Sequence, residues 1–324
     1  MTVLLLLVTV LSAGAWYATS QLASLNDLST PPPEISGEVL EGDADIVIDT
    51  LPAQDHVERE RQLVGTPYIT PVPTGSLTVL MMGVDARPGQ PIDIQVRADS
   101  LAVVHINPET GICRMLSIPR DTRVPLPGYG YSKVNHPLVI GGVPYQQLVV
   151  GKYLGIEFDH YGLIDFAGMA KFVDAVGGVT IENLDYAFEL DGYKFPIGTL
   201  DLSGEEAVLY ARYRGGPDGD YGRQMRQQQV ARALLEESAG LNIITAVPDI
   251  LAAVRGHIRT DTNGRGIMDL AQKYRSPCSA DSLETASLEG TVALGWDDLS
   301  GQELSFVHVQ DMDVQQKVAW LLGG

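Results

Sequence analysis

The sequence has little cysteine, little lysine and no run of basic residues. Its 324 residues contain two cysteines, 6 lysines and 16 arginines, and 41 acidic against 22 basic side chains give a formal net charge of -19. This balance argues against a general affinity for nucleic acid or for an anionic membrane face, because both depend on basic side chains. The cysteines match no metal or redox spacing. A disulfide between them would be permitted outside the cell, but Cys113 lies in an apolar run and is expected to be a small core residue.

Charged residues are also missing from the beginning of the chain, where the first is Asp27. Residues 3–18 are almost wholly apolar and slightly short of the roughly 20 residues that a membrane-spanning helix needs. We expect residues 1–22 to be a single transmembrane anchor, with a cleaved signal peptide as the alternative because Ala13-Gly14-Ala15 resembles a cleavage site. In either case the rest of the chain is predicted to lie outside the cytoplasm.

Residues 23–76 contain little that could form a core. They are rich in proline, acidic and small residues, as in Pro31-Pro32-Pro33, and we expect a disordered linker. The composition changes at Leu77, where we place the start of a catalytic domain over residues 77–324. The apolar runs LTVLMMGV, SLAVVHIN and ICRMLSI are typical of central strands.

Helical patterns follow these strands at residues 145–154 and 166–176, the second ended by Gly177-Gly178. Ser203 and Glu206 form a capping-box pattern before another helix, and a long final helix is expected over residues 221–241 with Asp220 as its cap. Strands that alternate with helices predict an α/β fold, a three-layer α-β-α sandwich with a central mixed sheet.

Five short polar clusters lie at the expected strand ends and helix starts, where α/β proteins usually bind their ligands. They cover residues 83–90, 97–100, 118–121, 210–214 and 222–229. Seven of the 16 arginines fall in them: Arg87, Arg97, Arg120, Arg212, Arg214, Arg223 and Arg226. The planar guanidinium group matches phosphate oxygens in two-point contacts. This concentration in an acidic protein predicts a polyanionic ligand, with phosphate the natural choice.

Two of the clusters pair an acid with an arginine two residues away, which places both on one face of an extended strand. Asp85 is paired in this way with Arg87, and Asp99 with Arg97. A single such pair is more simply interpreted as a surface salt bridge. Two converging carboxylates, however, can hold Mg²⁺, which completes its coordination with water and phosphate oxygens.

The spacing of the remaining basic residues limits which of them can contact one ligand together. Arg212 and Arg214 would diverge by about 200° in a continuous helix, so joint action requires a helix end or an extended segment. Arg223, Arg226 and Gln227 are related by three and four and share one helical face, although a solvated face is the simpler alternative.

The ordered series of motifs resembles the LytR-CpsA-Psr proteins, also called cell envelope-related transcriptional attenuator domains. The series consists of GVDARPGQ, RADS, SIPRDTRVPLPGYG, KVN followed by Gly141-Gly142, LIDFAGMAKFVDAVGGV, LSGEEAVLYARYR and GDYGRQMRQQQV. The resemblance implies a membrane-anchored, extracytoplasmic, Mg²⁺-dependent phosphotransferase. Such enzymes move teichoic acid, capsule or similar glycans from a polyprenyl-pyrophosphate carrier onto peptidoglycan. The composition gives no support to a role in transcription.

The resemblance also implies roles for single residues, with Asp85 and Asp99 as metal ligands. The expected pyrophosphate-binding residues are Arg87, Arg97, Arg120, Lys133, Arg212, Arg214, Arg223, Arg226 and Gln227. The expected catalytic residues are Asp85, Arg97, Asp99, Arg120 and Asp121, and the general base stays open among the three acids. Gln90, Ala98 and His136 depart from the family pattern without removing a charged site residue.

In this family the lipid tail lies in an apolar tunnel between sheet and helices. Its lining could come from Leu163, Phe166, Met169, Phe172 and Val173, but their spacing suits any buried helix face, so core packing is the default interpretation of each. Two other functions stay open at this point. One is a pyrophosphatase that transfers the same intermediate to water, and the other is a non-catalytic module that binds wall polymers.

Overall fold

The computed structural model describes residues 70, 72–86, 92, 96–217, 219–239, 249–274 and 276–324. The expected anchor, nearly all of the expected linker, Arg87 and Gln90 lie outside these ranges. Within them, no helix combines the length and the apolar composition that crossing a membrane requires.

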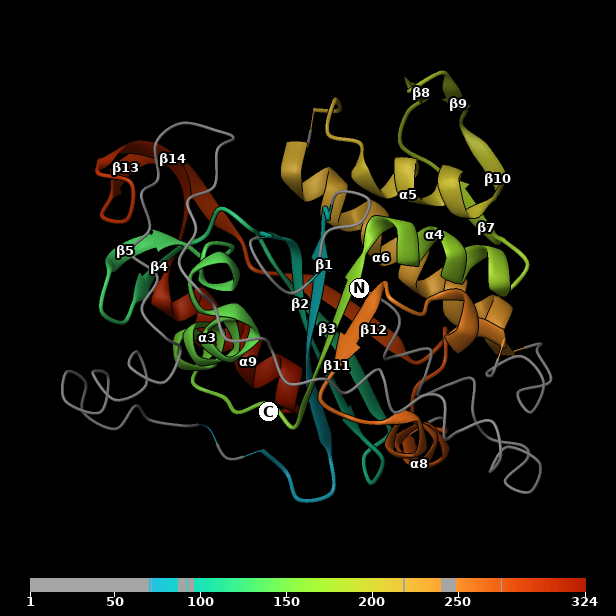
Figure 1. Ribbon diagram of the computed structural model, residues 1–324, viewed down its shortest axis with the longest axis horizontal. Helices are drawn as coiled ribbons and strands as arrows, with labels where there is room; N and C mark the ends of the chain where they lie inside the picture. The colour runs from blue at the N-terminus through green and yellow to red at the C-terminus, as the bar shows by residue number, and fades with distance from the viewer. Residues whose placement is uncertain are drawn as a thin grey trace.

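The domain is built on a six-stranded mixed sheet in the order β11-β6-β1-β2-β3-β12 (Figure 1). The strands are β1 (Leu77–Val84), β2 (Ala98–Asn107), β3 (Ile112–Ile118), β6 (His160–Asp165), β11 (Ile258–Thr260) and β12 (Leu283–Ser287). β1 pairs in parallel with β6, and β3 with β12, whereas β2 runs antiparallel to both β1 and β3. As a result, the carboxyl ends of β1, β3, β6 and β12 and the start of β2 meet at one edge, which we call the site edge.

Alternate residues of the central strand face two separate cores. In β1, Val79 and Met81 belong to one buried cluster, and Leu80 and Met82 to the other. Helices α4 (Phe166–Ala175), α5 (Gly204–Arg212), α6 (Gly219–Ala239) and α8 (Gly264–Tyr274) cover the first face. Helices α3 (Pro137–Leu154) and α9 (Asp311–Leu322) cover the second. The predicted three-layer sandwich with a central mixed sheet is confirmed.

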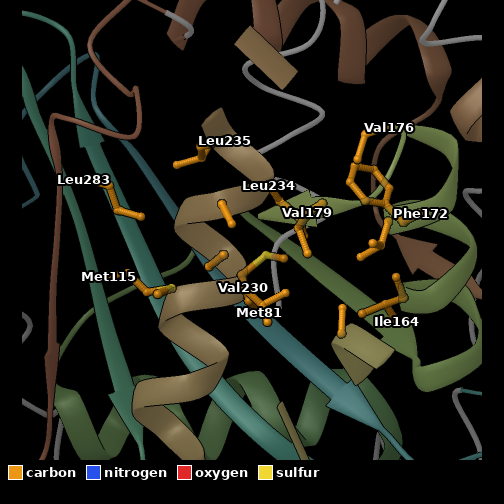
Figure 2. Close-up of a cluster of buried hydrophobic side chains, with 14 of the residues drawn as sticks. Met81, Met115, Ile164, Phe172, Val176, Val179, Val230, Leu234, Leu235 and Leu283 are labelled. Atoms are coloured by element: carbon orange, nitrogen blue, oxygen red, sulfur yellow. The ribbon is translucent and has the colours of Figure 1, made fainter. Parts of the chain in front are cut away.

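Helix α6 lies across the first face and forms the middle of that core. Figure 2 shows its Val230, Leu234 and Leu235 pointing toward Met81 and Met115 of the sheet, all of them buried. Burial of each such side chain stabilises the fold by about 1.5–3 kcal/mol. This packing fixes α6 over the sheet with its N-terminal turns at the site edge. The helix is the one expected over residues 221–241, but it is not the final helix, because α8 and α9 follow.

Local signals in the sequence account for most element boundaries. The three predicted central strands are β1, β2 and β3, and α4 ends just before Gly177 and Gly178, whose φ angles of 99° and 100° favour glycine. At the start of α5 the Glu206 carboxylate accepts the Ser203 backbone N–H at 2.9 Å, which confirms the capping box. The α3 helix begins earlier than expected because a kink at Gly142 interrupts its pattern.

In the part of the chain that the structure describes, four two-stranded ribbons surround the sheet. They are β4 (Arg123–Leu126) with β5 (Gly130–Lys133), β7 (Val179–Asn183) with β10 (Gly198–Leu202), β8 (Phe188–Leu190) with β9 (Tyr193–Phe195), and β13 (Gly290–Asp297) with β14 (Gln302–Val309). A bridge between Thr122 and Val307 ties the β13–β14 ribbon to the chain just after β3. The β4–β5 ribbon carries Lys133 at its end.

The two cysteines form a disulfide with a Cα–Cα distance of 5.1 Å. Cys113 is buried, which confirms its prediction as a core residue, and the pairing that the sequence left open is present. The cause is a long-range pairing: β12 lies parallel to β3 with Leu283 opposite Cys113, which brings the chain around Cys278 to the start of β3. No local pattern in the sequence reports this pairing.

Candidate functional site

Asp85 and Asp99 lie at neighbouring strand ends on the site edge, as predicted. In the β1–β2 pair Gly83 is opposite Ser100 and Val84 is opposite Ala98, so Asp99 is the extra residue of a β-bulge. A bulge often re-aims a side chain beside a functional site. Asp85 directly follows β1, and its side chain is 56% exposed, whereas that of Asp99 is 19% exposed.

Asp99 connects two of the expected arginines. A terminal nitrogen of Arg120, Nη1, donates to Asp99 Oδ1, and Nη1 of Arg223 donates to the Asp99 backbone carbonyl at 2.8 Å. The end of β3 and the start of α6 therefore meet at the same bulged residue.

Asp121 is held between two cations. Lys133 Nζ lies 2.8 Å from Asp121 Oδ1, and Arg120 Nε lies 3.7 Å from Asp121 Oδ2. The structure thus brings the expected site residue Lys133 beside Arg120. It does so by way of the β4–β5 ribbon rather than the sheet.

Arg212 and Arg214 meet the condition that their spacing imposed. Helix α5 ends at Arg212, and Tyr213 has the extended angles φ -62° and ψ 135°. Arg212 Nη2 lies 3.5 Å from Asp85 Oδ2, and Arg214 Nε lies 3.8 Å from an oxygen of Asp220. Both arginine side chains are 42% exposed, so their guanidinium groups are available to a ligand. The ring of Phe166 lies 4.7 Å below the Arg212 guanidinium.

Arg223 occupies the first turns of α6 and is buried. Its Nη2 lies 2.8 Å from Asp220 Oδ1, and burial lowers its pKa, an effect that the Asp220 carboxylate opposes. Asp220 therefore links Arg214 with Arg223. Sequence reasoning assigned Asp220 only as a helix cap, although its position three residues before Arg223 was a signal for the ion pair.

Arg97 and Gln227 are the remaining expected site residues near this cluster. We call the exposed arginines Arg97, Arg212 and Arg214 together with Gln227 the ligand-facing set. Arg97 is exposed and has no hydrogen bond or ion pair with any residue that the structure describes. Burial lowers the pKa of His136 to about 4, and the charge of Arg97 acts in the same direction. Gln227 lies on the wall of an apolar pocket next to this cluster.

The expected site residue Arg226 does not point to the ligand side. It is 2% exposed, its Nη2 donates to the Tyr213 carbonyl at 2.5 Å, and its Nη1 donates to the Tyr186 hydroxyl at 3.1 Å. We therefore correct its interpretation as a pyrophosphate-binding residue. Arg223 and Arg226 are three residues apart and were therefore predicted to lie on one face of α6. That face begins at the site and continues into the protein core.

The apolar pocket opens between the sheet and helices α4, α5 and α6 and has a cavity volume of about 40 Å³. Its lining comprises Gly83, Ser100, Ile164, Asp165, Phe166, Met169, Val208, Ala211, Gln227 and Val230. Of the expected tunnel residues, Phe166 and Met169 line it. Leu163 faces the opposite core, because side chains alternate along β6, and Phe172 and Val173 are packed in the first core.

No group of three or more His, Cys, Asp or Glu side chains that could hold a metal ion occurs within the described ranges. The expected donor set is smaller, consisting of the carboxylates of Asp85 and Asp99. Mg²⁺ is usually bound through one or two carboxylates and completes its octahedron with water and phosphate oxygens. The two acids therefore fit Mg²⁺ bound together with a phosphate ligand.

Fold and site together define an α/β protein with a cluster of arginines and carboxylates at the ends of its strands, beside an apolar pocket. The chain belongs to the LytR-CpsA-Psr family, since the model of the LytR_cpsA_psr family matches residues 49–318.

Curated relatives and solved structures agree with this membership. The chain is 38% identical to a protein of Halalkalibacterium halodurans named polyisoprenyl-teichoic acid--peptidoglycan teichoic acid transferase TagU, over 66% of this chain and 69% of that protein. It is 33% identical to a Bacillus cereus protein of the same name, over 68% and 71%. The crystal structure of B. subtilis TagV is 28% identical, covers 76% of this chain and 97% of its own, and superposes with a TM-score of 0.64.

Proposed function

We propose that this chain is a glycopolymer ligase that moves a glycan with one phosphate from a polyprenyl-pyrophosphate carrier onto peptidoglycan. The relatives named as teichoic acid transferases support this reaction class. The single observation that carries the proposal is the position of the exposed arginines. Arg212 stands over Phe166, which also lines the apolar pocket, so an anionic headgroup and an apolar tail find adjacent places.

The basic side chains have different roles in the proposed binding of the pyrophosphate. Arg97, Arg212 and Arg214 contact the pyrophosphate oxygens with their exposed guanidinium groups. Arg120 holds Asp99 in place and offers its remaining donors to the same phosphates, and Lys133 adds a second cation beside it. Such transfers need positioning and neutralisation of charge more than covalent catalysis.

Mg²⁺ is the expected cofactor, and Asp85 and Asp99 are the residues that would hold it. When bound, the ion would neutralise phosphate charge that builds up during transfer. In its absence, each of the two carboxylates faces an arginine, Arg212 for Asp85 and Arg120 for Asp99. Binding of a magnesium–pyrophosphate ligand would replace the exposed pair between Asp85 and Arg212 by contacts to the ligand, while Arg120 keeps its bond to Asp99.

In the proposed reaction an acceptor sugar hydroxyl attacks the phosphorus on the glycan side of the pyrophosphate. A bond forms from this oxygen to phosphorus, the bond to the bridging oxygen breaks, and polyprenyl monophosphate leaves with the electron pair. The hydroxyl proton passes to a carboxylate, for which Asp85, Asp99 and Asp121 are the candidates. The oxygens of Asp121 are both near cations, and Asp85 is the most exposed of the three.

We also propose that the domain acts outside the cytoplasm, anchored by residues 1–22. The disulfide supports this location, because such bonds persist in oxidising compartments. The substrate's long prenyl chain must stay partly in the bilayer, and an anchor keeps enzyme and substrate in one thin layer. Protease added to intact spheroplasts should digest the domain, and a protected domain would contradict this location.

One experiment separates the proposed reaction from its rivals. Purified domain is mixed with Mg²⁺, a short polyprenyl-pyrophosphate disaccharide and peptidoglycan fragments in ¹⁸O-labelled water, and the products are identified by mass spectrometry. A ligase gives a phosphodiester on peptidoglycan without ¹⁸O, and chelation of the metal stops it. Free glycan phosphate carrying ¹⁸O would instead establish a pyrophosphatase. Recovery of unreacted substrate bound to the protein would establish a binding module.

A further inference from the structure

Arg226 is a buried cation outside the ligand-facing set, and its surroundings are aromatic. The centre of its guanidinium group lies 5.2 Å from the ring centroid of Tyr213, 5.6 Å from that of Phe188 and 6.0 Å from that of Tyr186. The Tyr213 ring in turn stacks on Phe188 at 3.9 Å with an interplanar angle of 14°. This arrangement fixes both the ring and the backbone of Tyr213.

The carbonyl that Arg226 binds belongs to the peptide bond between Tyr213 and Arg214. It is the point at which the chain leaves α5, and its extended geometry is what lets Arg212 and Arg214 serve one ligand. Without a donor this carbonyl would lie at a helix end whose last carbonyls have no partner within the helix. Arg226 therefore sets the orientation of the peptide plane from which Arg214 projects.

The same helix acts on a second ligand-facing segment one turn earlier. Arg223 donates to the backbone carbonyl of Asp99, as Arg226 does to that of Tyr213. The first turns of α6 thus hold two segments that carry expected ligand-binding side chains. Packing of α6 against the sheet then gives both segments a rigid support.

We infer that Arg226 is a positioning residue for the pyrophosphate site, acting through Arg214 rather than by contact with the ligand. This inference rests on the proposed binding of pyrophosphate. Lysine cannot replace arginine here, because one ammonium on a flexible stem cannot reach both the Tyr213 carbonyl and the Tyr186 hydroxyl in a planar geometry. Arg226→Lys should keep the buried charge and lose the fixed orientation.

The chain offers a matched control two turns further along α6. Arg232 donates to two backbone carbonyls, those of Ala280 and Leu283, where Arg226 donates to one carbonyl and one hydroxyl. The two carbonyls lie just before and at the start of β12, at the opposite end from the site edge. Arg232→Lys should therefore lower stability to a similar degree and leave the site unchanged.

The test is a double-mutant cycle on the affinity of the full chain for inorganic pyrophosphate with Mg²⁺, measured by calorimetry. Arg226→Lys should weaken binding about 10-fold in the parent and less than about 3-fold in the Arg214→Ala background, because its effect passes through Arg214. Arg232→Lys should change the affinity less than about 2-fold. If Arg226→Lys fails to fold, Tyr186→Phe, which removes one acceptor and keeps the ring, takes its place in the cycle with a smaller loss.

Three outcomes would overturn the inference. Additive losses would mean that Arg226 binds the ligand itself, and unchanged affinity with reduced thermal stability would leave it a merely structural role. Hydrogen exchange gives the third, since the backbone amides of residues 213–216 should exchange faster in Arg226→Lys than in Arg232→Lys, and equal rates would contradict positioning. Failure of the parent to bind pyrophosphate would overturn the proposed function, while the exchange comparison still decides the role of Arg226.

Discussion

Two pairs of arginines in this protein have similar sequence spacing and opposite surroundings. Arg212 and Arg214 are 42% exposed and face carboxylates at 3.5 and 3.8 Å. Arg223 and Arg226 are 3% and 2% exposed and donate to backbone carbonyls at 2.8 and 2.5 Å. The first pair is held loosely at the surface, and the second is held firmly inside.

The difference shows that the site contains both exposed arginines that can change partners and buried arginines that keep their hydrogen bonds. An exposed guanidinium in a long ion pair loses little when it changes partner, so it can turn to a phosphate. A buried guanidinium has already lost its hydration and is costly to leave without partners, so it stays with its carbonyls. We expect substitutions in the exposed pair to act on binding, and those in the buried pair to act through the segments that they hold.

The largest effect is expected at the carboxylates that face this arginine site. Asp99→Asn should lower Mg²⁺-dependent turnover by roughly 100-fold or more, and Asp85→Asn should do likewise, because each removes an anionic ligand for the metal. The fold should persist, since neither acid is in the core. Asp201→Asn, an exposed acid bonded to Thr180, is the control in a turnover assay. Full activity in the Asp85 and Asp99 double variant would contradict their assignment as metal ligands.

A smaller effect is expected when the exposed arginines keep their charge but lose their planar shape. Arg212→Lys or Arg214→Lys should each weaken pyrophosphate binding roughly 10-fold, because lysine makes one-point contacts. Arg120→Lys should behave in the same way and also loosen Asp99. Arg114→Lys, which faces Glu284 away from the site, is the control. Parental affinity in the lysine variants, measured by calorimetry, would show that the fork geometry does not matter.

The smallest effect on the site is expected from the buried histidines, which should act on stability. Burial lowers the pKa of both His105 and His136 from 6.5 to about 4. Between these values the unfolded chain binds more protons than the folded one, so stability should fall as pH decreases from about 6.5 toward 4 and should be constant above that range. Thermal melting at pH 7 and pH 5 measures the sum of all such contributions, including that of His160, whose pKa the Asp261 carboxylate raises and which acts in the opposite direction. The contribution of His136 is therefore isolated by His136→Gln, which should reduce the loss of stability between pH 7 and pH 5. An unchanged difference would contradict the role of His136.

Much of the fold followed from local chemistry. Runs of Val, Ile and Leu long enough for one strand predicted β1, β2 and β3, and the glycines after α4 predicted its end. The site edge was also predictable, because polar clusters such as residues 83–90 directly follow buried strands. Joint action of Arg212 and Arg214 required a helix end or an extended segment, and α5 ends at Arg212 with Tyr213 extended.

The sequence could not predict the surroundings of single side chains, because these depend on how helices and strands are oriented after packing. Arg223, Arg226 and Gln227 share one face of α6, yet Arg226 is enclosed by aromatic rings and Gln227 lines the pocket. Helical periodicity predicts which residues share a face of a helix, but not which elements pack against that face. Leu163 could be named as a possible tunnel residue for the same reason, and alternation along β6 places it in the opposite core, in agreement with the default of core packing. The disulfide depends on the parallel pairing of β12 with β3, which joins distant segments.

The disulfide has a consequence for how the protein tolerates damage. It spans 165 residues of sequence, with Asp85 and Asp99 before the closed loop and Arg120, Arg212 and Arg214 within it. A single cleavage of the backbone anywhere between Cys113 and Cys278 leaves the two pieces covalently joined. The acids proposed to bind metal and the arginines proposed to bind phosphate then stay in one molecule, and a nicked chain separates into fragments only after its disulfide is reduced.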